Sequence, residues 1–490
     1  MNATTLAGRP LHHPDNVLDL IEPWLETDRP AVVDPRIELS YRDLDTMSAS
    51  MAAELIGRGV AVGDPVLVHA RLSAWAVAAM LGVLRAGARY VAVDADFPAQ
   101  RQQAMVAASG AAAALIEPGL ARPAVGDSGD GSGSGSSAGG GDGGRGAATR
   151  RGPLAYTCFT SGSTGRPRAV TVPSAALAYS TAARLAYYAE PVTGFLLCSS
   201  ISFDSSVAGI YWTLSCGGLL AIPSDRPADL AAMGRFADRY RCSHLLMVPS
   251  LYAVALAGGV GGSLGSLSTV VVAGEDCPPG LVARHFETVP GARLYNEYGP
   301  TECTVWSTVH HCVPADALGP RVPIGRPIPG TAVSVPSTGV GELSIGGPGV
   351  ADGGIYRTGD LVSLRGDGAL LFHGRIDHQL KLGGVRVERA EIEHAVMSFP
   401  AVTQAAVAIE RIAGATQVGG RPRLVGFVVA DGAIDRPALR RHLLARLPAV
   451  AVPARIEVVS SLPRQPNGKV DHRAIDRLAG QLPPVGGPPR

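Results

Sequence analysis

The sequence predicts a large layered α/β domain followed by a small α+β domain. Three observations support this. The chain has 490 residues, more than one ordinary hydrophobic core accommodates. From about residue 64 to 310, short β-branched runs alternate with helical patterns, which is typical of layered α/β folds. Near residue 374 this alternation gives way to a hairpin-like pair and a short mixture of helices and strands.

The elements of the first domain follow in order along the chain. Strands are expected over 65–70, 90–94, 194–200, 219–223, 244–249 and 269–276, and helices over 73–88, 230–240 and 280–289. Residues 126–152 are rich in Gly and Ser and do not suit a packed core. Because the α/β pattern resumes after them, we expect a flexible surface insertion there rather than a domain boundary.

The second domain reads as a hairpin, a helix, two strands, a helix and a last strand. These are expected over 379–388, 389–399, 405–410, 424–430, 436–448 and 455–460. We therefore predict domains 1–375 and 376–490, with the hinge at Asp377.

Composition excludes several classes of protein. No apolar run approaches the about 20 residues of a membrane span, and the first residues do not form a secretory signal, so a cytoplasmic protein is expected. A net charge of +1 gives no reason to expect the positively charged surface that binds nucleic acid or an anionic membrane. The seven cysteines have no CxxC spacing, so neither a disulfide framework nor a zinc site is predicted.

The chain has 43 lysines and arginines, and only Lys381 and Lys469 are lysines. A compact ammonium can lie between crowded oxygens where a planar guanidinium cannot, so both lysines are candidates for chemistry. Chance under a coding bias toward arginine is the alternative. That alternative weakens only if both lysines fall inside recognisable site motifs.

The stretch YTCFTSGSTGRPRAV, residues 156–170, is a candidate phosphate loop. A strand leads into Ser, Thr and Gly residues whose N–H and hydroxyl groups can surround phosphate oxygens. It matches neither a Walker A loop nor GxGxxG. By itself it would be better explained as a Ser/Gly-rich turn.

Together with other motifs this stretch resembles the phosphate loop of the acyl-adenylate-forming superfamily. The later motifs of that superfamily are matched, in order, by NEYGPTE (296–302), YRTGDL (356–361), GRIDHQLKLGGVRVERAEIE (374–393) and PNGKVD (466–471). Further matches are LSYRDLD (39–45), LRAGARYVAVDADFPAQR (84–101), SFDSSV (202–207) and GELSIGGPGV (341–350). Within the superfamily the chain is most similar to amino-acid adenylation domains of nonribosomal peptide synthesis.

This resemblance implies ATP-dependent activation of an amino acid as aminoacyl-AMP, with release of pyrophosphate. The implied phosphate-binding residues are Thr160, Ser161, Gly162, Ser163, Thr164, Gly165 and Arg168. Thr301 is implied to touch the α-phosphate and Glu302 to bind Mg²⁺, an ion that prefers carboxylate and phosphate oxygens. Tyr298 and Asn296 are implied beside adenine. Asp360 and Arg375 are implied to hold the ribose; a capping role for Asp360 and core packing for Tyr298 are the alternatives.

The two lysines take separate roles in this resemblance. Adenylation brings a carboxylate against the α-phosphate, so stabilising crowded negative oxygens is the main task. Lys469 is implied to bridge these groups, and a solvated turn lysine is the alternative. After adenylation the small domain of this family rotates, which is implied to present Lys381 for transfer of the product to a phosphopantetheine thiol.

Asp204 is implied to pair with the α-ammonium of an amino acid, and a helix N-cap is its alternative. The implied side-chain pocket is formed by Ser205, Ala208, Met247, Val271, Ala273, Glu297, Val305 and Trp306. We expect a tyrosine-like substrate, because the pocket is apolar and Glu297 offers an acceptor. A basic side chain paired with Glu297 is the runner-up, since a buried charge requires a partner.

Some positions depart from the family pattern. Arg168 and Ala169 replace the usual Lys-Gly, Gly383 stands where Arg is usual, and the segment 349–361 is short. No carrier motif follows residue 472, so we expect a stand-alone domain serving a separate peptidyl carrier protein. An MbtH-like accessory protein is a further candidate partner. An acyl- or aryl-CoA ligase and a non-catalytic adenylate-binding scaffold are the alternative functions.

Overall fold

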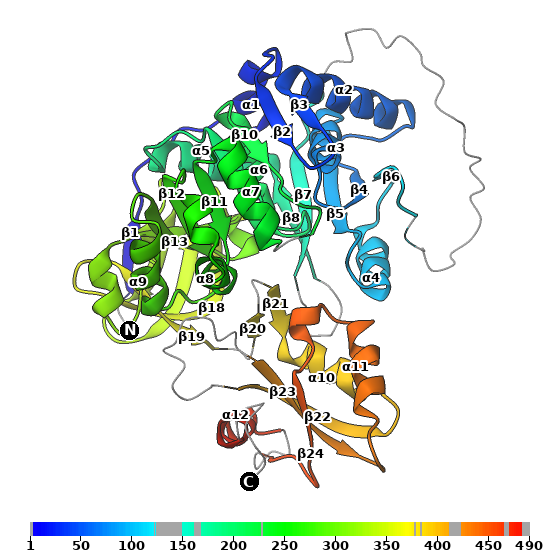
Figure 1. Ribbon diagram of the computed structural model, residues 1–490, viewed down its shortest axis with the longest axis vertical. Coiled ribbons are helices and arrows are strands. Elements are labelled where there is room, and N and C mark those ends of the chain that lie inside the picture. Colours follow the sequence, from blue (N-terminus) through cyan, green and yellow to red (C-terminus); the bar gives the residue numbers. More distant parts are fainter. Residues whose placement is uncertain are drawn as a thin grey trace.

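A computed structural model describes residues 3–121, 123, 149–160, 168–226, 229–376, 379–382, 385–410, 423–464 and 470–482. Figure 1 shows a large body of sheets and helices with a smaller unit beneath it, which confirms the predicted architecture. The predicted boundary between 375 and 376 falls between the strands β19 (Leu370–Arg375) and β20 (Gln379–Leu382), and it stays a prediction. Asp377, the predicted hinge, and most of the predicted insertion lie outside the described residues.

The largest sheet has nine strands, most of them parallel. Its order is β15 (Arg326–Pro327), β14 (Thr308–Cys312), β13 (Arg293–Tyr298), β12 (Thr269–Ala273), β11 (His244–Met247), β9 (Gly194–Leu196), β10 (Leu219–Ala221), β2 (Pro30–Val33) and β3 (Glu38–Ser40). The strands from β13 to β2 are parallel to one another, whereas β14 returns antiparallel to β13. The carboxyl ends of β11, β12 and β13 therefore meet at one edge.

A second sheet of five strands lies beside the first (Figure 1). Its order is β6 (Ala113–Ile116), β4 (Pro65–Ala70), β5 (Arg89–Asp94), β7 (Leu154–Thr160) and β8 (Arg168–Pro173). β4 has the predicted bounds of its strand, and β7 and β8 form an antiparallel hairpin that pairs Thr160 with Arg168. A third, antiparallel sheet has the order β1 (Ala3–Ala7), β16 (Ala332–Pro336), β17 (Gly341–Gly346), β18 (Ile355–Leu364) and β19.

The helices of the large domain pack on these sheets. They are α1 (Leu18–Leu25), α2 (Tyr41–Gly57), α3 (Ala74–Arg85), α4 (Ala99–Ser109), α5 (Ser174–Tyr187), α6 (Asp204–Ser215), α7 (Leu230–Tyr240), α8 (Pro249–Ala257) and α9 (Pro279–Thr288), with 3₁₀ turns η1 (Val260–Leu264), η2 (Thr301–Cys303) and η3 (Pro314–Leu318). One buried cluster joins residues of α3, α5 and α6 to strands of both main sheets. These helices are covered on both sides and are buried almost all round; α3 is apolar, whereas α5 and α6 also bury polar side chains such as Thr181 and Thr213.

Side-chain caps fix where several helices begin. The Ser40 hydroxyl accepts from the Asp43 N–H, and the Asp43 carboxylate accepts from the Ser40 N–H, which is a capping box at α2. Ser73, Asp229, Asp435 and Asp471 cap α3, α7 and two helices of the small domain. Each such cap stabilises its helix by about 1 kcal/mol.

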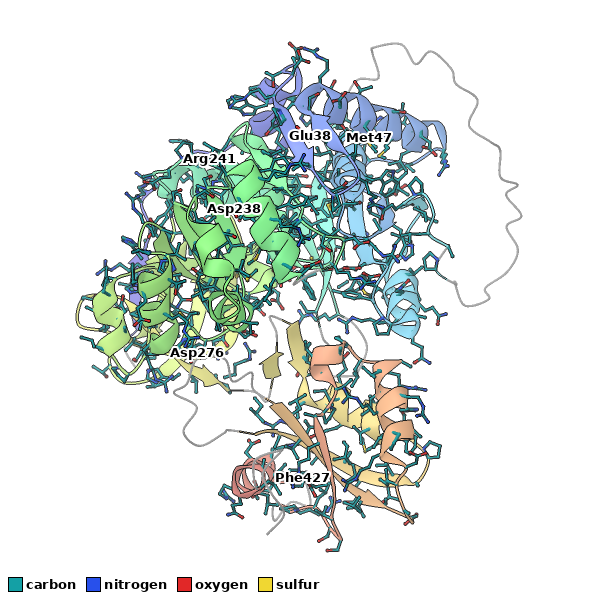
Figure 2. All side chains as sticks on the ribbon, viewed as in Figure 1. Glu38, Met47, Asp238, Arg241, Asp276 and Phe427 are labelled. Carbon is teal, nitrogen blue, oxygen red and sulfur yellow. The ribbon has the colours of Figure 1, made fainter. Side chains whose placement is uncertain are left out.

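The small domain is a hairpin followed by a three-stranded sheet with helices on both faces. Its elements are β20, β21 (Val385–Glu388), α10 (Arg389–Met397), β22 (Val402–Glu410), β23 (Arg423–Ala430), α11 (Arg436–Leu444), η4 (Ala449–Ala451), β24 (Arg455–Val458) and α12 (His472–Gln481). One apolar cluster packs under α10 and α11, and a second packs under α12 around Phe427 (Figure 2). Among the described residues, no helix has the length and apolarity that a membrane span requires.

Glu393 on α10 gives the small domain a pH dependence. Its carboxylate accepts from the Val407 N–H at 2.9 Å and lies 3.5 Å from the His472 ring. Burial raises the pKa of Glu393 from 4.5 to about 7, against the smaller lowering effects of the Val407 N–H and Arg389. A carboxyl whose pKa is higher in the folded state favours folding below 4.5, and this contribution is lost as the pH rises to about 7.

We expect Glu393→Gln to remove this loss, because Gln keeps an acceptor for the Val407 N–H without a buried charge. The variant small domain should be more stable than the natural one above pH 7, and the two should converge toward pH 4.5. Urea denaturation across this range measures the difference. Equal stabilities above pH 7 would contradict the assignment.

Candidate active site

A cavity opens at the edge where the parallel strands end. Ligands of open α/β sheets bind outside the carboxyl ends of strands, because backbone and side-chain polar groups are accessible there. Leu246 and Val248 come from the end of β11, Ala273 and Gly274 from the end of β12, and Glu297 from the end of β13. The cavity has a volume of about 110 Å³.

The structure brings together predicted residues from three separate motifs, with Ala273 and Val305 from outside them. Those that line the cavity are Thr160, Asp204, Ser205, Ala273, Glu297, Thr301 and Val305. Sequence reasoning missed the other lining residues, which are Arg101, Cys158, Phe159, Ser199, Ser202, Phe203, Leu246, Val248, Gly274 and Gly299. Most of these are small or apolar residues in or beside the motifs, and nothing in their type marks them as functional.

Four predicted pocket residues are not on the cavity wall: Ala208, Met247, Val271 and Trp306. Met247 is one position away from the β11 residue that lines the cavity, and successive side chains of a strand point to opposite faces. Leu246 therefore faces the cavity, while Met247 packs in the core on the other side of the sheet. Ala208, Val271 and Trp306 are buried in the core that joins the two main sheets.

Asp204 is half-buried on the cavity wall at the first position of α6. The N-cap alternative is wrong, because Phe203 holds the N-cap position and no side chain caps this helix by a hydrogen bond. Burial, and secondarily the negative charge of Asp204, raises the pKa of the Cys158 thiol well above its ordinary value. Asp204 thus brings a carboxylate into a cavity that is otherwise lined mostly by apolar and hydroxyl-bearing residues, with Arg101 and Glu297 as the other charged ones.

Glu297 is paired inside the protein with Arg184, a residue outside the predicted pocket. Arg184 of α5 donates from Nη1 to Oε1 at 2.6 Å and from Nη2 to Oε2 at 2.8 Å. The Tyr188 hydroxyl donates to Oε1. The Arg184 and Glu297 side chains are each 1% exposed, so this is a fully buried bidentate ion pair.

Aromatic rings surround the Arg184 guanidinium. It lies 4.4 Å from the ring centre of Trp306 and 5.3 Å from that of Trp212. The Tyr188 ring stacks on Trp306 with centres 5.8 Å apart. The predicted pocket residue Trp306 therefore contacts Arg184 behind the pocket instead of the cavity itself.

A second charged cluster joins β13, β18 and β19. The Asp360 carboxylate accepts from Arg375 Nη1 at 2.7 Å and from the Tyr298 hydroxyl. Burial, then the charge of Asp360, raises the pKa of Tyr298 well above its ordinary value, so the hydroxyl stays a donor. Asn296 is buried, and its Nδ2 donates to the Pro323 carbonyl at 2.8 Å. Asp360 and Arg375, both expected to hold the ribose, are therefore in direct contact.

The turn after β13 has an unusual backbone. Thr304 and Val305 both have positive φ, at 55° and 79°, a conformation that is strained for β-branched residues. Two hydrogen bonds hold it: Ser180 donates to the Thr304 carbonyl at 2.9 Å, and the Thr304 hydroxyl donates to the Gly349 carbonyl at 2.7 Å. This turn places Thr301 and Val305 on the cavity, with Glu302 buried beside them.

Several predicted residues lie outside the described residues: Ser161, Gly162, Ser163, Thr164, Gly165, Asp377, Gly383 and Lys469. Thr160 and Arg168, at the two ends of the predicted phosphate loop, are described and paired in the β7–β8 hairpin. Lys381 belongs to β20 and pairs with Arg386 across the β20–β21 hairpin. Arg464 and Val470, on either side of the Lys469 segment, form an antiparallel bridge.

The small domain contacts the large one beside the cavity. Phe203 packs against the apolar cluster under α10, and Arg101 lies 3.6 Å from Glu391 in the first turn of α10. Figure 1 shows the β20–β21 hairpin on the side of the small domain that faces the large domain, with α12 at the opposite end. The helix α12, which follows the Lys469 segment, therefore lies on the side of the small domain that faces away from the large domain.

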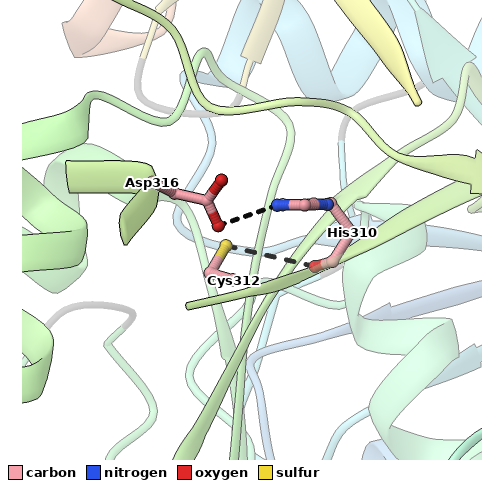
Figure 3. A group of neighbouring side chains, drawn as sticks. All are labelled: His310, Cys312 and Asp316. Atoms are coloured by element: carbon pink, nitrogen blue, oxygen red, sulfur yellow. Dashed lines mark hydrogen bonds and ion pairs between the residues drawn. The ribbon is translucent and has the colours of Figure 1, made fainter. Parts of the chain in front are cut away.

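A third cluster, His310, Cys312 and Asp316, is shown in Figure 3, with potential ligand atoms within 4.8 Å of one another. Asp316 accepts from His310 Nε2 at 2.9 Å and from the Val313 N–H at 2.8 Å, and its other oxygen lies 3.9 Å from Arg365. Burial raises the pKa of Cys312 well above its ordinary value, which disfavours the thiolate that a metal needs. These contacts give the cluster a structural role: hydrogen bonds of Asp316 hold η3 against β14.

The pair Arg101–Glu391 joins the two domains. Burial lowers the pKa of Arg101 and raises the pKa of Glu391, and Arg101 Nε and Glu391 Oε2 have no hydrogen-bond partner among the described residues. Arg101→Met should leave Glu391 buried without a cation, which costs about 3–5 kcal/mol for a buried pair. We expect the domains to leave this arrangement, measured by the distance between spin labels on α4 and α11.

Arg101→Met combined with Glu391→Leu is the matched control, because it removes both charges and should restore the distance. An unchanged distance distribution in Arg101→Met alone would contradict a role for the pair.

Comparisons with known proteins agree with these motifs. The sequence profile of the family described as "AMP-binding enzyme" matches residues 25–353, and that of the "AMP-binding enzyme C-terminal domain" matches residues 391–469. The chain is 35% identical over 476 residues to AMB antimetabolite synthetase AmbB of Pseudomonas aeruginosa, covering 90% of this chain and 37% of that protein. It is 33% identical over 533 residues to novobiocin biosynthesis protein H of Streptomyces niveus, covering 97% of this chain and 85% of that protein.

The chain spans less than half the length of the first two curated relatives, AmbB and the phosphinothricin tripeptide synthetase PhsC of Streptomyces viridochromogenes. Among solved structures, amide bond synthetase McbA from Marinactinospora thermotolerans has a TM-score of 0.80 at 24% identity, covering 94% of this chain and 99% of that one. A nonribosomal synthetase protein containing adenylation and PCP domains has a TM-score of 0.78 at 24% identity, covering 94% and 84%. These two structures support the fold.

Proposed function

This chain belongs to the AMP-binding enzyme family, as an adenylation domain of the acyl-adenylate-forming superfamily, and from that premise we propose that it activates an amino acid. It is an AMP-forming ligase of the nonribosomal type. The proposed reaction joins the amino acid's carboxylate to the α-phosphorus of ATP. The bond to the β-phosphate breaks, and pyrophosphate leaves with its electron pair.

The observation that carries this proposal is one cavity lined by both Asp204 and Thr301. Asp204 offers a carboxylate for an α-ammonium group, and Thr160 and Thr301 offer hydroxyl groups toward phosphate oxygens. An amino acid held by its ammonium at one side would present its carboxylate toward a nucleotide at the other. An acyl- or aryl-CoA ligase has no need of this acidic group.

The nucleotide would lie against the second charged cluster. We propose that Asp360 and Arg375 hold the ribose hydroxyls, with Tyr298 and Asn296 beside adenine and the loop 161–165 with Arg168 around the outer phosphates. The buried carboxylate of Glu302, beside Thr301, suits Mg²⁺, which prefers oxygen ligands and binds with substrate phosphates. Bound there, Mg²⁺ would neutralise phosphate charge.

We propose a tyrosine-like substrate. The structure supports this less strongly than the sequence did, because internal donors occupy most of the acceptor positions of Glu297. Glu297 accepts three hydrogen bonds inside the protein, and a carboxylate has about four acceptor positions. Among the described residues this leaves one acceptor position, on a side chain that is 1% exposed, and we propose that a hydroxyl group at the tip of the substrate's side chain reaches it. Leu246, Ala273 and Val305 supply an apolar wall in front of it.

Transfer of the product to the phosphopantetheine thiol of a separate peptidyl carrier protein completes the proposed function. The hairpin bearing Lys381 faces the large domain, which supports this part of the proposal. An MbtH-like accessory protein remains a candidate partner.

ATP/pyrophosphate exchange with a panel of acids tests the activity. We expect exchange with at least one amino acid and none with the same acid lacking its α-amine. Exchange with acids that lack an amine would instead favour the CoA ligase. If the folded protein shows no exchange with any acid, the non-catalytic scaffold would be favoured.

The two lysines should separate the half-reactions. Lys469→Ala should lower exchange by at least about a hundredfold, because two anions would then meet without a central cation. Lys381→Ala should leave exchange within about twofold of the natural rate and slow transfer to the carrier. Equal losses of both half-reactions in both variants would contradict the assignment.

Asp360→Asn should raise the KM for ATP by about tenfold or more, because it weakens hydrogen bonds to a charged acceptor. Tyr298→Phe is the matched comparison, since it removes one donor to Asp360 and leaves the carboxylate and Arg375 in place. An unchanged KM for ATP in Asp360→Asn would place the ribose elsewhere.

A further inference from the structure

Glu297 occupies a position from which its carboxylate could select the substrate's side chain. The negative charge of that carboxylate is already neutralised by Arg184. It lines the cavity at the end of β13, where an unpaired carboxylate would attract a cationic side chain. The structure instead shows a complete bidentate pair with Arg184, reinforced by the Tyr188 hydroxyl. Arg184 is not a cavity-lining residue, so it acts on the pocket from behind Glu297.

Arg184 is firmly held in this place. Trp306 and Trp212 both contact the guanidinium plane, and the side chain is 1% exposed. If a substrate cation displaced it from Glu297, the guanidinium would remain buried without a counter-charge. Its Nε already has no hydrogen-bond partner among the described residues, so the surroundings offer it little compensation.

We propose that Arg184 is a specificity-determining residue, which neutralises Glu297 and makes the side-chain pocket select neutral amino acids over cationic ones. The inference rests on the proposed amino-acid adenylation. It decides between the two substrate classes that the sequence left open, because the position expected to bind a basic side chain already holds an internal cation. A neutral hydroxyl tip remains compatible with the one acceptor position left on Glu297.

The proposal predicts a switch of substrate class. In Arg184→Ala, Glu297 loses its internal cation, and the ammonium or guanidinium group of a basic substrate can take the place of that cation. We expect exchange with ornithine, lysine or arginine to rise at least about tenfold over the natural protein, relative to exchange with neutral amino acids.

The experiment is ATP/pyrophosphate exchange with neutral and basic amino acids, on the full chain. Glu297→Gln is the matched control, because it leaves Arg184 in place, removes the negative charge and should gain no basic substrate. Arg184→Lys should keep the natural preference, since it retains the cation. Thermal unfolding establishes that each variant is folded, and Arg184→Gln, which keeps much of the side-chain length, replaces Arg184→Ala if that variant does not fold.

Each outcome bears on the proposal. A neutral preference in the natural protein, with a gain of basic substrates in Arg184→Ala or Arg184→Gln, supports it. A basic preference in the natural protein overturns it while leaving amino-acid adenylation intact. A folded variant without the gain also overturns it. Absence of exchange with any acid removes the proposed function itself, which is a distinguishable result.

Discussion

The site depends on one constraint: parallel strands buried on both faces can present polar groups only where they end. β11, β12 and β13 are covered by helices along their length, and their carboxyl ends lie side by side. Glu297 and the turn bearing Thr301 follow from the last of these strands. Asp204 reaches the same edge because the neighbouring strand β9 leads into α6. The motifs are far apart in sequence, and the sheet brings them together.

Burial strengthens the interactions between the charged groups at this edge of the sheet. Arg184 with Glu297, and Asp360 with Arg375, are pairs that water does not screen, so each fixes the local geometry more than it adds stability. The two pairs differ in where they lie. The first pair is enclosed by aromatic rings behind the pocket, and the second lies at the junction of β18 and β19, where the chain leaves the large domain. One therefore shapes what the pocket accepts, while the other links the nucleotide side to the connection between domains.

Sequence patterns predicted the elements well where a run of β-branched residues has clear limits, as in β4. The motifs also predicted which residues gather at the cavity, since Thr160, Asp204 and Thr301 meet there. Side-chain direction was harder, because a shift of one residue on β11 exchanges Met247 for Leu246. Arg184 could not be found at all: it lies on an apolar helix outside every motif, and its pairing with Glu297 spans 113 positions. Only the packed fold shows that partnership.

The small domain has an apolar cluster on each face of its own sheet. The contacts named at its junction with the large domain are different in kind: the Phe203 ring and the long Arg101–Glu391 pair. Because most of the small domain's apolar contacts are internal, a rotation about its connection would uncover only the part of the first cluster that Phe203 contacts. The small domain should therefore be transferable as a unit between related enzymes. The recipient must keep an arginine and an aromatic ring where this chain has Arg101 and Phe203.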